Sequence, residues 1–155
     1  MPELELLAPA AAAAALAAAA DDTARGFLGL DPVTQNEALL ARELSRADAA
    51  VFRYGDTVLG CRVNPDQPRQ SEVASTTADP VALGALLDFL HTYQRCESFV
   101  ALVPDALDVS GYTALGFAPV GLLREHRYAA GRYHDVRVLH GTHGVTATDR
   151  RPAAG

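Results

Sequence analysis

The sequence predicts an α/β protein in which helices flank a mixed, mostly antiparallel sheet. Apolar residues recur at helical spacing in some segments and form the short runs typical of strands in others. Turn signals at Gly55-Asp56 and Ala130-Gly131 place hairpins toward both ends of the chain, and a well-defined helix start lies between them. The expected order of elements is β-α-α-β-β-β-α-β-α-β-β, a sheet covered by helices on its faces.

In the first third of the chain we expect one strand and two helices. Leu4 and Leu6 alternate with glutamates, as in a short half-buried strand. Alanine has the highest helix propensity and proline suits the first helical position, so the alanine run predicts a helix from Pro9 to about Asp21-Asp22. Residues 37–46 place three leucines on one helical face and predict the second helix.

Three strands and a loop should follow. Residues 49–63 contain two apolar runs around Gly55-Asp56, and glycine at the first position of a two-residue turn favours a type II′ hairpin. Residues 64–70 hold two prolines and are interpreted as a loop. Residues 72–77 are rich in β-branched side chains and predict a short strand.

A central helix is expected to begin at Asp79-Pro80, because aspartate is a good N-cap and proline fits the first turn. Apolar residues then recur at helical spacing and predict one face packed on the sheet. These residues are Leu83, Leu86, Leu87, Leu90 and Tyr93.

The last part of the chain predicts a buried strand, a short helix and a terminal hairpin. Residues 98–103 form a continuous apolar run, as in a central strand. Residues 105–115 are expected to form the short helix, with Gly116 placed to cap it. Residues 117–123 and 132–139 are the expected final strands.

Composition limits the class of protein further. With 155 residues, 49% of them apolar, and a net charge of −6, the chain has the size of one domain, and disorder is excluded. We expect one domain over residues 1–144 and a flexible tail over 145–155. Cys61 and Cys96 are too few for a disulfide framework and lack metal-ligand spacing, so we interpret them as reduced structural thiols.

The alanine run at residues 8–20 is neither a signal peptide nor a membrane span. Glu3 and Glu5 stand where a signal peptide carries positive charge, and the run is too short and too weakly apolar to cross a bilayer. We therefore expect a cytoplasmic protein with no membrane partner.

Residues 112–135, YTALGFAPVGLLREHRYAAGRYHD, carry a specific string of motifs. Tyr112 stands four residues before Gly116-Phe117, followed by Leu123-Arg124-Glu125 and then by Gly131-Arg132-Tyr133 with Asp135. This string resembles the GNAT superfamily of N-acyltransferases, in particular its ribosomal-protein N-terminal and phosphinothricin-type acetyltransferase branch. The rest of the chain agrees with that family in the order of elements.

The resemblance implies attack of a substrate amine on the thioester of acetyl-CoA or another acyl-CoA. The amine must lose a proton, the oxyanion needs a backbone N–H donor, and the thiolate benefits from an acid. Tyr112 matches the family position for the acid, and Glu72, on the strand before the central helix, is the candidate base. The alternatives are a tyrosine that packs the short helix onto the sheet and a solvated glutamate.

The family's glycine-rich loop for pyrophosphate is absent before the central helix. Asp79 would occupy the helix N–H groups and repel a phosphate, and Pro80 removes a donor. Another carboxylate replaces the asparagine that the family has seven residues before the tyrosine. The residues at the cofactor-binding positions are Thr76, Thr77, Ala78, Gly84 and Asp105.

Charge is unevenly distributed along the chain. Residues 1–115 carry seven Arg against sixteen acidic residues, whereas residues 116–155 carry six Arg against three and hold four of the five His. This pattern indicates a local site for an anionic ligand or an arginine-rich solvated strand face. Arg124, His134 and His140 are the candidate substrate-binding residues, and the two histidines, six apart, would share one strand face. Ordinary surface histidines are the alternative, and no metal site is expected.

Three functions are therefore compatible with the sequence. The first is an N-acyltransferase that moves an acyl group, most simply acetyl, from acyl-CoA to a small-molecule or peptide amine. The second is an amide-forming enzyme of this fold that uses an aminoacyl-tRNA or a carrier-protein thioester. The third is a non-catalytic binding protein that has lost the donor site. A homodimer formed through the last strands would be ordinary for such a fold.

Overall fold

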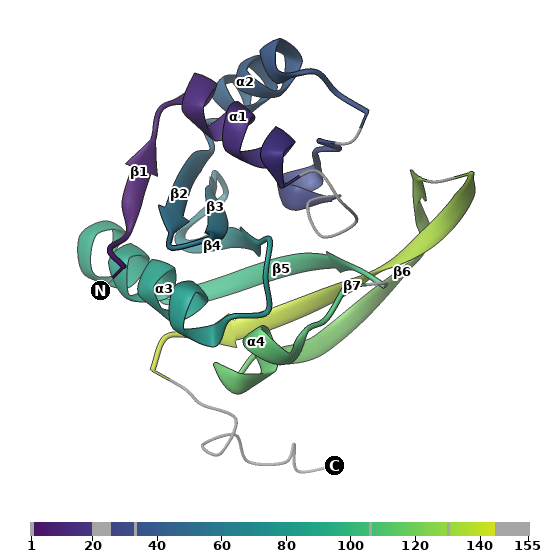
Figure 1. The fold of residues 1–155 in the computed structure, drawn as a ribbon. Helices are drawn as coiled ribbons and strands as arrows, with labels where there is room; N and C mark the ends of the chain where they lie inside the picture. The colour runs from purple at the N-terminus through teal and green to yellow at the C-terminus, as the bar shows by residue number, and fades with distance from the viewer. Residues whose placement is uncertain (1, 20–25, 33, 106, 130, 145–155) are drawn as a thin grey trace.

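The computed structural model describes residues 2–19, 26–32, 34–105, 107–129 and 131–144 (Figure 1). Its strands are β1 (Glu5–Leu7), β2 (Ala50–Tyr54), β3 (Thr57–Asn64), β4 (Gln67–Ser75), β5 (Ser98–Pro104), β6 (Ala118–Ala129) and β7 (Arg132–Thr142). Its helices are α1 (Pro9–Ala18), α2 (Glu37–Arg46), α3 (Pro80–Gln94) and α4 (Ser110–Ala114), with a 3-10 turn η1 (Phe27–Gly29). Apart from that turn, this is the predicted order of elements. The predicted tail at 145–155 and the predicted helix end at Asp21-Asp22 lie outside the described residues.

One mixed sheet organises the chain, as predicted. Its strand order is β1-β2-β3-β4-β5-β7-β6, and all neighbouring strands are antiparallel except β4 and β5. Helices α1 and α2 lie over the β1–β4 half, whereas α3 and α4 lie on the other side of the sheet (Figure 1). Each layer buries its own apolar cluster, one around Leu16 and Leu44 under α1 and α2, the other around Leu86 and Phe99 under α3.

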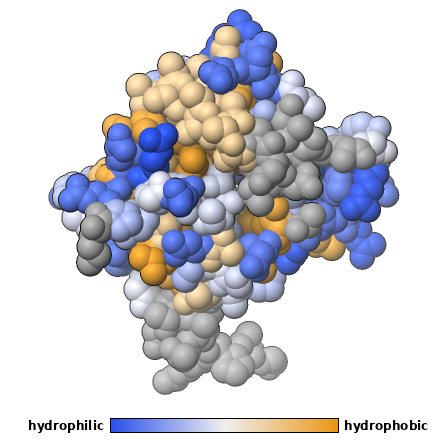
Figure 2. Space-filling model, viewed as in Figure 1, coloured by the Kyte–Doolittle hydropathy of each residue, from blue (hydrophilic) through white to orange (hydrophobic). Residues whose placement is uncertain are grey.

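Helix α1 packs against the rest of the protein through three alanines and one leucine. Ala12, Ala13, Ala15 and Leu16 are buried, and the rest of the helix faces solvent with methyl groups. Figure 2 shows this weakly apolar surface at the top of the molecule. Alanine therefore supplies both the helix propensity and a narrow surface that lets α1 lie close to the sheet.

Several local sequence signals act as predicted. The side chain of Asn36 accepts a hydrogen bond from the Leu39 N–H at 2.8 Å and caps α2. Asp79 accepts from the Val81 N–H at 2.9 Å and caps α3, with Pro80 at its first position. Gly55 supplies the positive φ, 58°, that the β2–β3 turn needs.

Other predictions at element boundaries are wrong. Strand β4 begins at Gln67, inside the predicted loop, because residues 65–66 form a tight turn and β4 pairs with β3 through Asn64. Helix α4 covers only Ser110–Ala114 of the predicted 105–115, and β6 and β7 are longer than predicted.

Two predicted burials are also wrong. Leu7, and not Leu6, is the buried residue of β1: Leu7 lies opposite Val51 and packs in the cluster under α1 and α2, whereas Leu6, opposite Phe52 on the other face of the sheet, is 65% exposed. Tyr93 follows the apolar face of α3 in spacing but lies in the last turn and is 73% exposed. Both errors concern which side of an element meets the rest of the protein, a property that depends on pairing partners far along the chain.

The parallel strands β4 and β5 are hydrogen-bonded only near the start of β5 and then diverge. Their pairing covers only Gln70 with Ser98, Ser71 with Phe99 and Glu72 with Val100. Beyond these pairs β4 continues to Ser75 and β5 to Pro104 without each other. The separation leaves a gap in the middle of the sheet, where β4 has no neighbouring strand on that side.

The buried thiols predict a pH-dependent stability. Burial raises the pKa of Cys61 from 9.0 to about 12. The folded protein keeps a proton that the unfolded chain releases above pH 9, so the free energy of unfolding falls between pH 9 and 12, by up to about 1.4 kcal/mol per pH unit. Urea unfolding at pH 8, 9.5 and 10.5 measures this slope, which should be smaller in Cys61→Ala. Equal slopes in both proteins would contradict the assignment.

Candidate functional site

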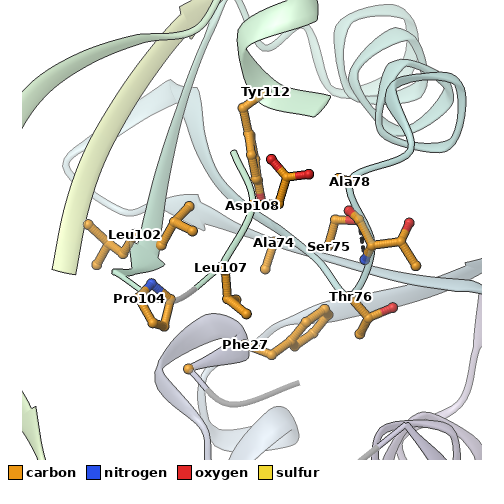
Figure 3. Close-up of a pocket in the computed structure, with 13 residues that line it drawn as sticks. Phe27, Ala74, Ser75, Thr76, Ala78, Leu102, Pro104, Leu107, Asp108 and Tyr112 are labelled. Atoms are coloured by element: carbon orange, nitrogen blue, oxygen red, sulfur yellow. Dashed lines mark hydrogen bonds between the residues drawn. The ribbon is translucent and has the colours of Figure 1, made fainter. Parts of the chain in front are cut away.

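The gap between β4 and β5 opens into a cavity of about 90 Å³, here called the transfer cavity. It runs from Tyr112 on α4 to Phe27 on η1, and so passes through the sheet from one helical layer to the other (Figure 3). Its remaining lining residues come from β4 and the loop after it, from β5 and from the segment before α4. They are Gly26, Ala74, Ser75, Thr76, Thr77, Ala78, Leu102, Val103, Pro104, Leu107 and Asp108.

Tyr112 points into this cavity from α4. It is only 5% exposed and packs edge-on against Phe117, with ring centroids 5.3 Å apart. Burial raises the pKa of its phenol above the ordinary 10.0, and a hydrogen bond with the backbone of Ser75 opposes this rise. The phenol therefore keeps its proton throughout the neutral range.

The Ser75 N–H is available because of the gap. Backbone groups of successive strand residues point alternately to the two sides, and the next residue, Thr76, donates its N–H to Val58 of β3 at 3.0 Å. The Ser75 N–H therefore points away from β3 and toward the missing neighbour. Tyr112 and Ser75 line the same cavity, and the Ser75 backbone lowers the pKa of the phenol, as an N–H donor to its oxygen would, so the phenol's own hydrogen can be donated to a molecule in the cavity.

Asp108 is a cavity residue that the sequence analysis missed. Its carboxylate accepts hydrogen bonds from the Ser110 N–H at 2.9 Å and the Ser110 hydroxyl at 3.0 Å, and these bonds lower its pKa. Figure 3 shows this carboxylate beside Tyr112, facing the segment that ends at Ala78. The Asp-x-Ser spacing of an Asx turn was the available signal, but it indicates a turn and not a site.

Polar groups of the loop between β4 and α3 form hydrogen bonds with one another and with β3. The Thr76 hydroxyl accepts from the Val58 N–H at 3.0 Å, and the Thr77 hydroxyl shares a hydrogen bond with Thr57 at 2.8 Å. The Thr77 N–H donates to the Ser75 hydroxyl and the Asp79 N–H to the Thr77 hydroxyl, both at 3.3 Å.

These contacts do not fit a bound pyrophosphate. Such a group needs free N–H donors at the helix N-terminus, but Asp79 occupies that of Val81 and Pro80 has none. A Cβ on Gly111 of α4 would also lie 2.6 Å from the Ala78 carbonyl oxygen, so helix and loop are in direct contact here. The start of α3 therefore does not offer the N–H donors that the family's glycine-rich loop would give to a pyrophosphate.

Of the predicted cofactor-binding residues, the structure brings three to the cavity and leaves two elsewhere. Thr76, Thr77 and Ala78 line it. Gly84 lies within α3, where a Cβ would meet only Leu115 at 3.7 Å. The Asp105 carboxylate lies 3.3 Å from His134 Nδ1 and does not line the cavity.

Glu72 lies on the other face of the sheet from Tyr112. Its neighbour Val73 is buried with the α3 cluster, so the alternation of β4 turns Glu72 toward the α1 and α2 side. There it binds the Arg62 guanidinium at 2.6 Å and lines a second cavity of about 480 Å³. Leu102 lines both this second cavity and the transfer cavity.

The three predicted substrate-binding residues are dispersed over the last two strands. His134 and His140 share one face of β7, as predicted, but they are six residues apart, which is about 20 Å along a strand. His140 lies opposite Val100 of β5, and Arg124 is exposed on β6. None of the three lines the transfer cavity.

Within the described residues no helix is both long and apolar enough to cross a membrane. The same part of the chain contains no group of three or more His, Cys, Asp and Glu side chains arranged to hold a metal ion.

No family model and no curated protein matches the sequence, but solved structures match its fold. A chimera of the spermidine N-acetyltransferase SpeG from Vibrio cholerae and hSSAT has a TM-score of 0.68 at 15% identity, over 91% of this chain and 95% of that one. A probable acetyltransferase gives 0.66 at 14%, over 90% and 92%. Vibrio cholerae spermidine N-acetyltransferase in complex with CoA and spermine gives 0.68 at 14%, over 96% of both chains.

At such identities the likeness concerns the fold. The matches extend over nine-tenths or more of both chains, so they concern the whole arrangement of sheet and helices rather than one part of it. The family resemblance of the motif string at 112–135 implies the same fold. The chain therefore has the fold of the GNAT N-acetyltransferases.

Proposed function

We propose that the protein is an amine N-acyltransferase that takes its acyl group from a thioester. The observation that carries this proposal is the meeting of the Tyr112 hydroxyl with the Ser75 N–H inside the gap between β4 and β5. A proton donor and a backbone N–H thus converge on a small cavity that is open to both helical layers, in a fold whose solved neighbours are N-acetyltransferases.

The reaction needs few groups. The amine nitrogen attacks the carbonyl carbon of the thioester, the carbon–sulfur bond breaks, and the nitrogen loses a proton to a base or to water. The Tyr112 hydroxyl donates to the leaving sulfur, and a β4 backbone N–H that faces the gap, distinct from the Ser75 N–H that meets the phenol, stabilises the oxyanion. Glu72, on the acceptor side of the sheet, would receive the amine's proton through water, in competition with Arg62.

Acyl-CoA is the thioester that the comparisons favour, because one structural neighbour is a complex with CoA and spermine. The same complex favours an amine as the acceptor. The loop before α3 lacks the free N–H groups that would bind the pyrophosphate of CoA. We therefore expect contacts with the acyl end of the donor to contribute most of its binding free energy. The proposal places the enzyme in the cytoplasm, where acyl-CoA is made and used.

A second donor class is favoured by the same loop. Asp79 and Asp108 place two carboxylates near the position where the family holds phosphates, and Gly111 closes that position against Ala78. An aminoacyl-tRNA or a carrier-protein thioester presents its acyl group without a pyrophosphate in this loop. Transfer from such a donor should weaken as salt rises, because its phosphate contacts are ionic.

Calorimetric titration with CoA and acetyl-CoA at low salt tests the donor. We expect dissociation constants in the micromolar range, and tighter binding in Asp79→Asn, because that variant keeps a capping oxygen and removes the repelling charge. Glu37→Gln, in the first turn of α2, is the matched control and should bind as the parent does. Absence of heat with both ligands, together with transfer from aminoacyl-tRNA or a carrier thioester, would replace CoA by the second donor class.

A further inference from the structure

A third cavity of about 270 Å³ adjoins the transfer cavity on the α1 and α2 side of the sheet. Here called the acceptor cavity, it shares Gly26, Leu102 and Pro104 with the transfer cavity, so the two meet at these residues. Its other lining residues are Gly29, His126, Arg127 and Val136. The walls from β5 and β7 are apolar, and the positive charge comes from β6.

Arg127 is held in place but incompletely paired. Its Nη2 donates to the Leu30 carbonyl oxygen at 2.8 Å, which ties the end of β6 to the segment after η1. The Asp31 carboxylate stands 4.0 Å from the same nitrogen, beyond hydrogen-bond distance. Among the side chains that the structure describes, Arg127 Nε is the buried polar atom without a hydrogen-bond partner.

A buried N–H without a partner is unfavourable, and none of the described residues supplies an acceptor to this one, so the position suits a ligand that brings an acceptor with it. A guanidinium presents its N–H groups as a planar fork that matches the two oxygens of a carboxylate. The guanidinium here is mostly buried, with 18% of its side chain exposed, so an ion pair with a ligand would be screened little by solvent.

We propose that the acceptor is an amine that carries a carboxylate, which Arg127 binds in the acceptor cavity while the amine reaches the transfer cavity past Leu102. This assignment rests on the proposed acyl transfer and adds the substrate class to it. Leu102, 36% exposed where the cavities meet, would contact the carbon chain between the two groups.

The test uses pairs of acceptors in which one member has a carboxylate and the other has none: phenylalanine with phenethylamine, and β-alanine with ethylamine. In the parent protein the carboxylated member should have the higher kcat/KM. Arg127→Met should raise KM for that member by about 10- to 100-fold and leave the amine lacking the carboxylate unchanged. Arg42→Met, exposed on α2, is the matched control and should change neither.

Arg127→Met also removes the bond to Leu30, so a second variant separates recognition from support of the loop. Asp31→Asn leaves Arg127 in place and removes the carboxylate beside it. If Arg127 binds the acceptor, this variant should lower KM for the carboxylated member several-fold. If Arg127 only supports the loop, Asp31→Asn will leave the preference between the members unchanged or weaken it, and the proposal is overturned.

A binding measurement keeps this test independent of turnover. Calorimetric titration with phenylalanine and phenethylamine should show binding of phenylalanine that is lost in Arg127→Met. If acyl transfer occurs but both members of every pair react alike, the carboxylate assignment is wrong and the proposed function stands. If no amine is acylated while binding of phenylalanine depends on Arg127, the proposed function fails and the anion site stands.

Discussion

Replacement of Tyr112 by phenylalanine is expected to lower kcat for acyl transfer by about 100-fold or more, with little change in the KM of the donor. General acid catalysis contributes effects of about this size. The phenyl ring keeps the edge-on contact with Phe117 and the packing of α4, so only the hydroxyl and its bond with the Ser75 backbone are lost. Steady-state kinetics with the best donor and acceptor pair measures the effect.

The control for this variant is Tyr93→Phe, which removes a hydroxyl from a side chain that is 73% exposed on α3. Its kinetics should match those of the parent. An unchanged kcat in Tyr112→Phe would show that the leaving thiolate takes its proton elsewhere, and Tyr112 would then be a packing residue of α4.

The raised pKa of Tyr112 adds a pH signature to the same experiment. Burial keeps the phenol protonated above its ordinary pKa of 10.0, so the acid stays in its active form across the neutral and moderately alkaline range. A fall of kcat at high pH that is lost in Tyr112→Phe should therefore appear only above pH 10. A loss of activity near pH 8 that depends on Tyr112 would contradict the buried position of its hydroxyl.

Two glycine substitutions should change the free energy of unfolding in opposite directions, one where α4 touches the loop before α3 and the other inside α3. Gly111→Ala should lower the free energy of unfolding by about 1–3 kcal/mol, because its Cβ would lie 2.6 Å from a backbone oxygen of Ala78. Gly84→Ala should raise it by about 0.5–1 kcal/mol, because alanine stabilises a helix interior and the new Cβ meets Leu115 at an ordinary 3.7 Å.

Urea unfolding monitored by circular dichroism measures both changes. A stability unchanged by Gly111→Ala would show that the loop and α4 separate without cost, and the space for a donor phosphate would then be larger than the described contact allows. Gly111→Ala should also lower kcat, because Tyr112 is the next residue and moves with α4. Gly84→Ala should leave kcat unchanged if the position has no role in donor binding.

The sequence by itself predicts much of the fold because its strongest signals are local. Asn36 and Asp79 cap their helices by bonds within three residues, and Gly55 forms its turn through its own φ angle. The same locality makes Tyr112 recognisable, since Gly116-Phe117 follows it directly after the end of α4. The absence of a phosphate loop was likewise visible in the chain.

The boundaries of strands could not be predicted as well. Whether Leu6 or Leu7 is buried depends on the pairing of β1 with a strand more than forty residues later, and the start of β4 depends on its partner β3. Single-residue shifts of this kind exchange the two faces of a strand, and no local pattern determines them.

What the tertiary structure alone decided is how the functional groups are brought together. Glu72 and Tyr112 lie on opposite sides of the sheet, Asp108 joins Tyr112 in the transfer cavity, and Arg127 is bound to Leu30 from 97 positions away. The gap between β4 and β5 has no signal in either strand, because it arises from where two distant segments stop pairing. The sequence therefore determined the elements and the family likeness, whereas contacts between distant segments determined the site.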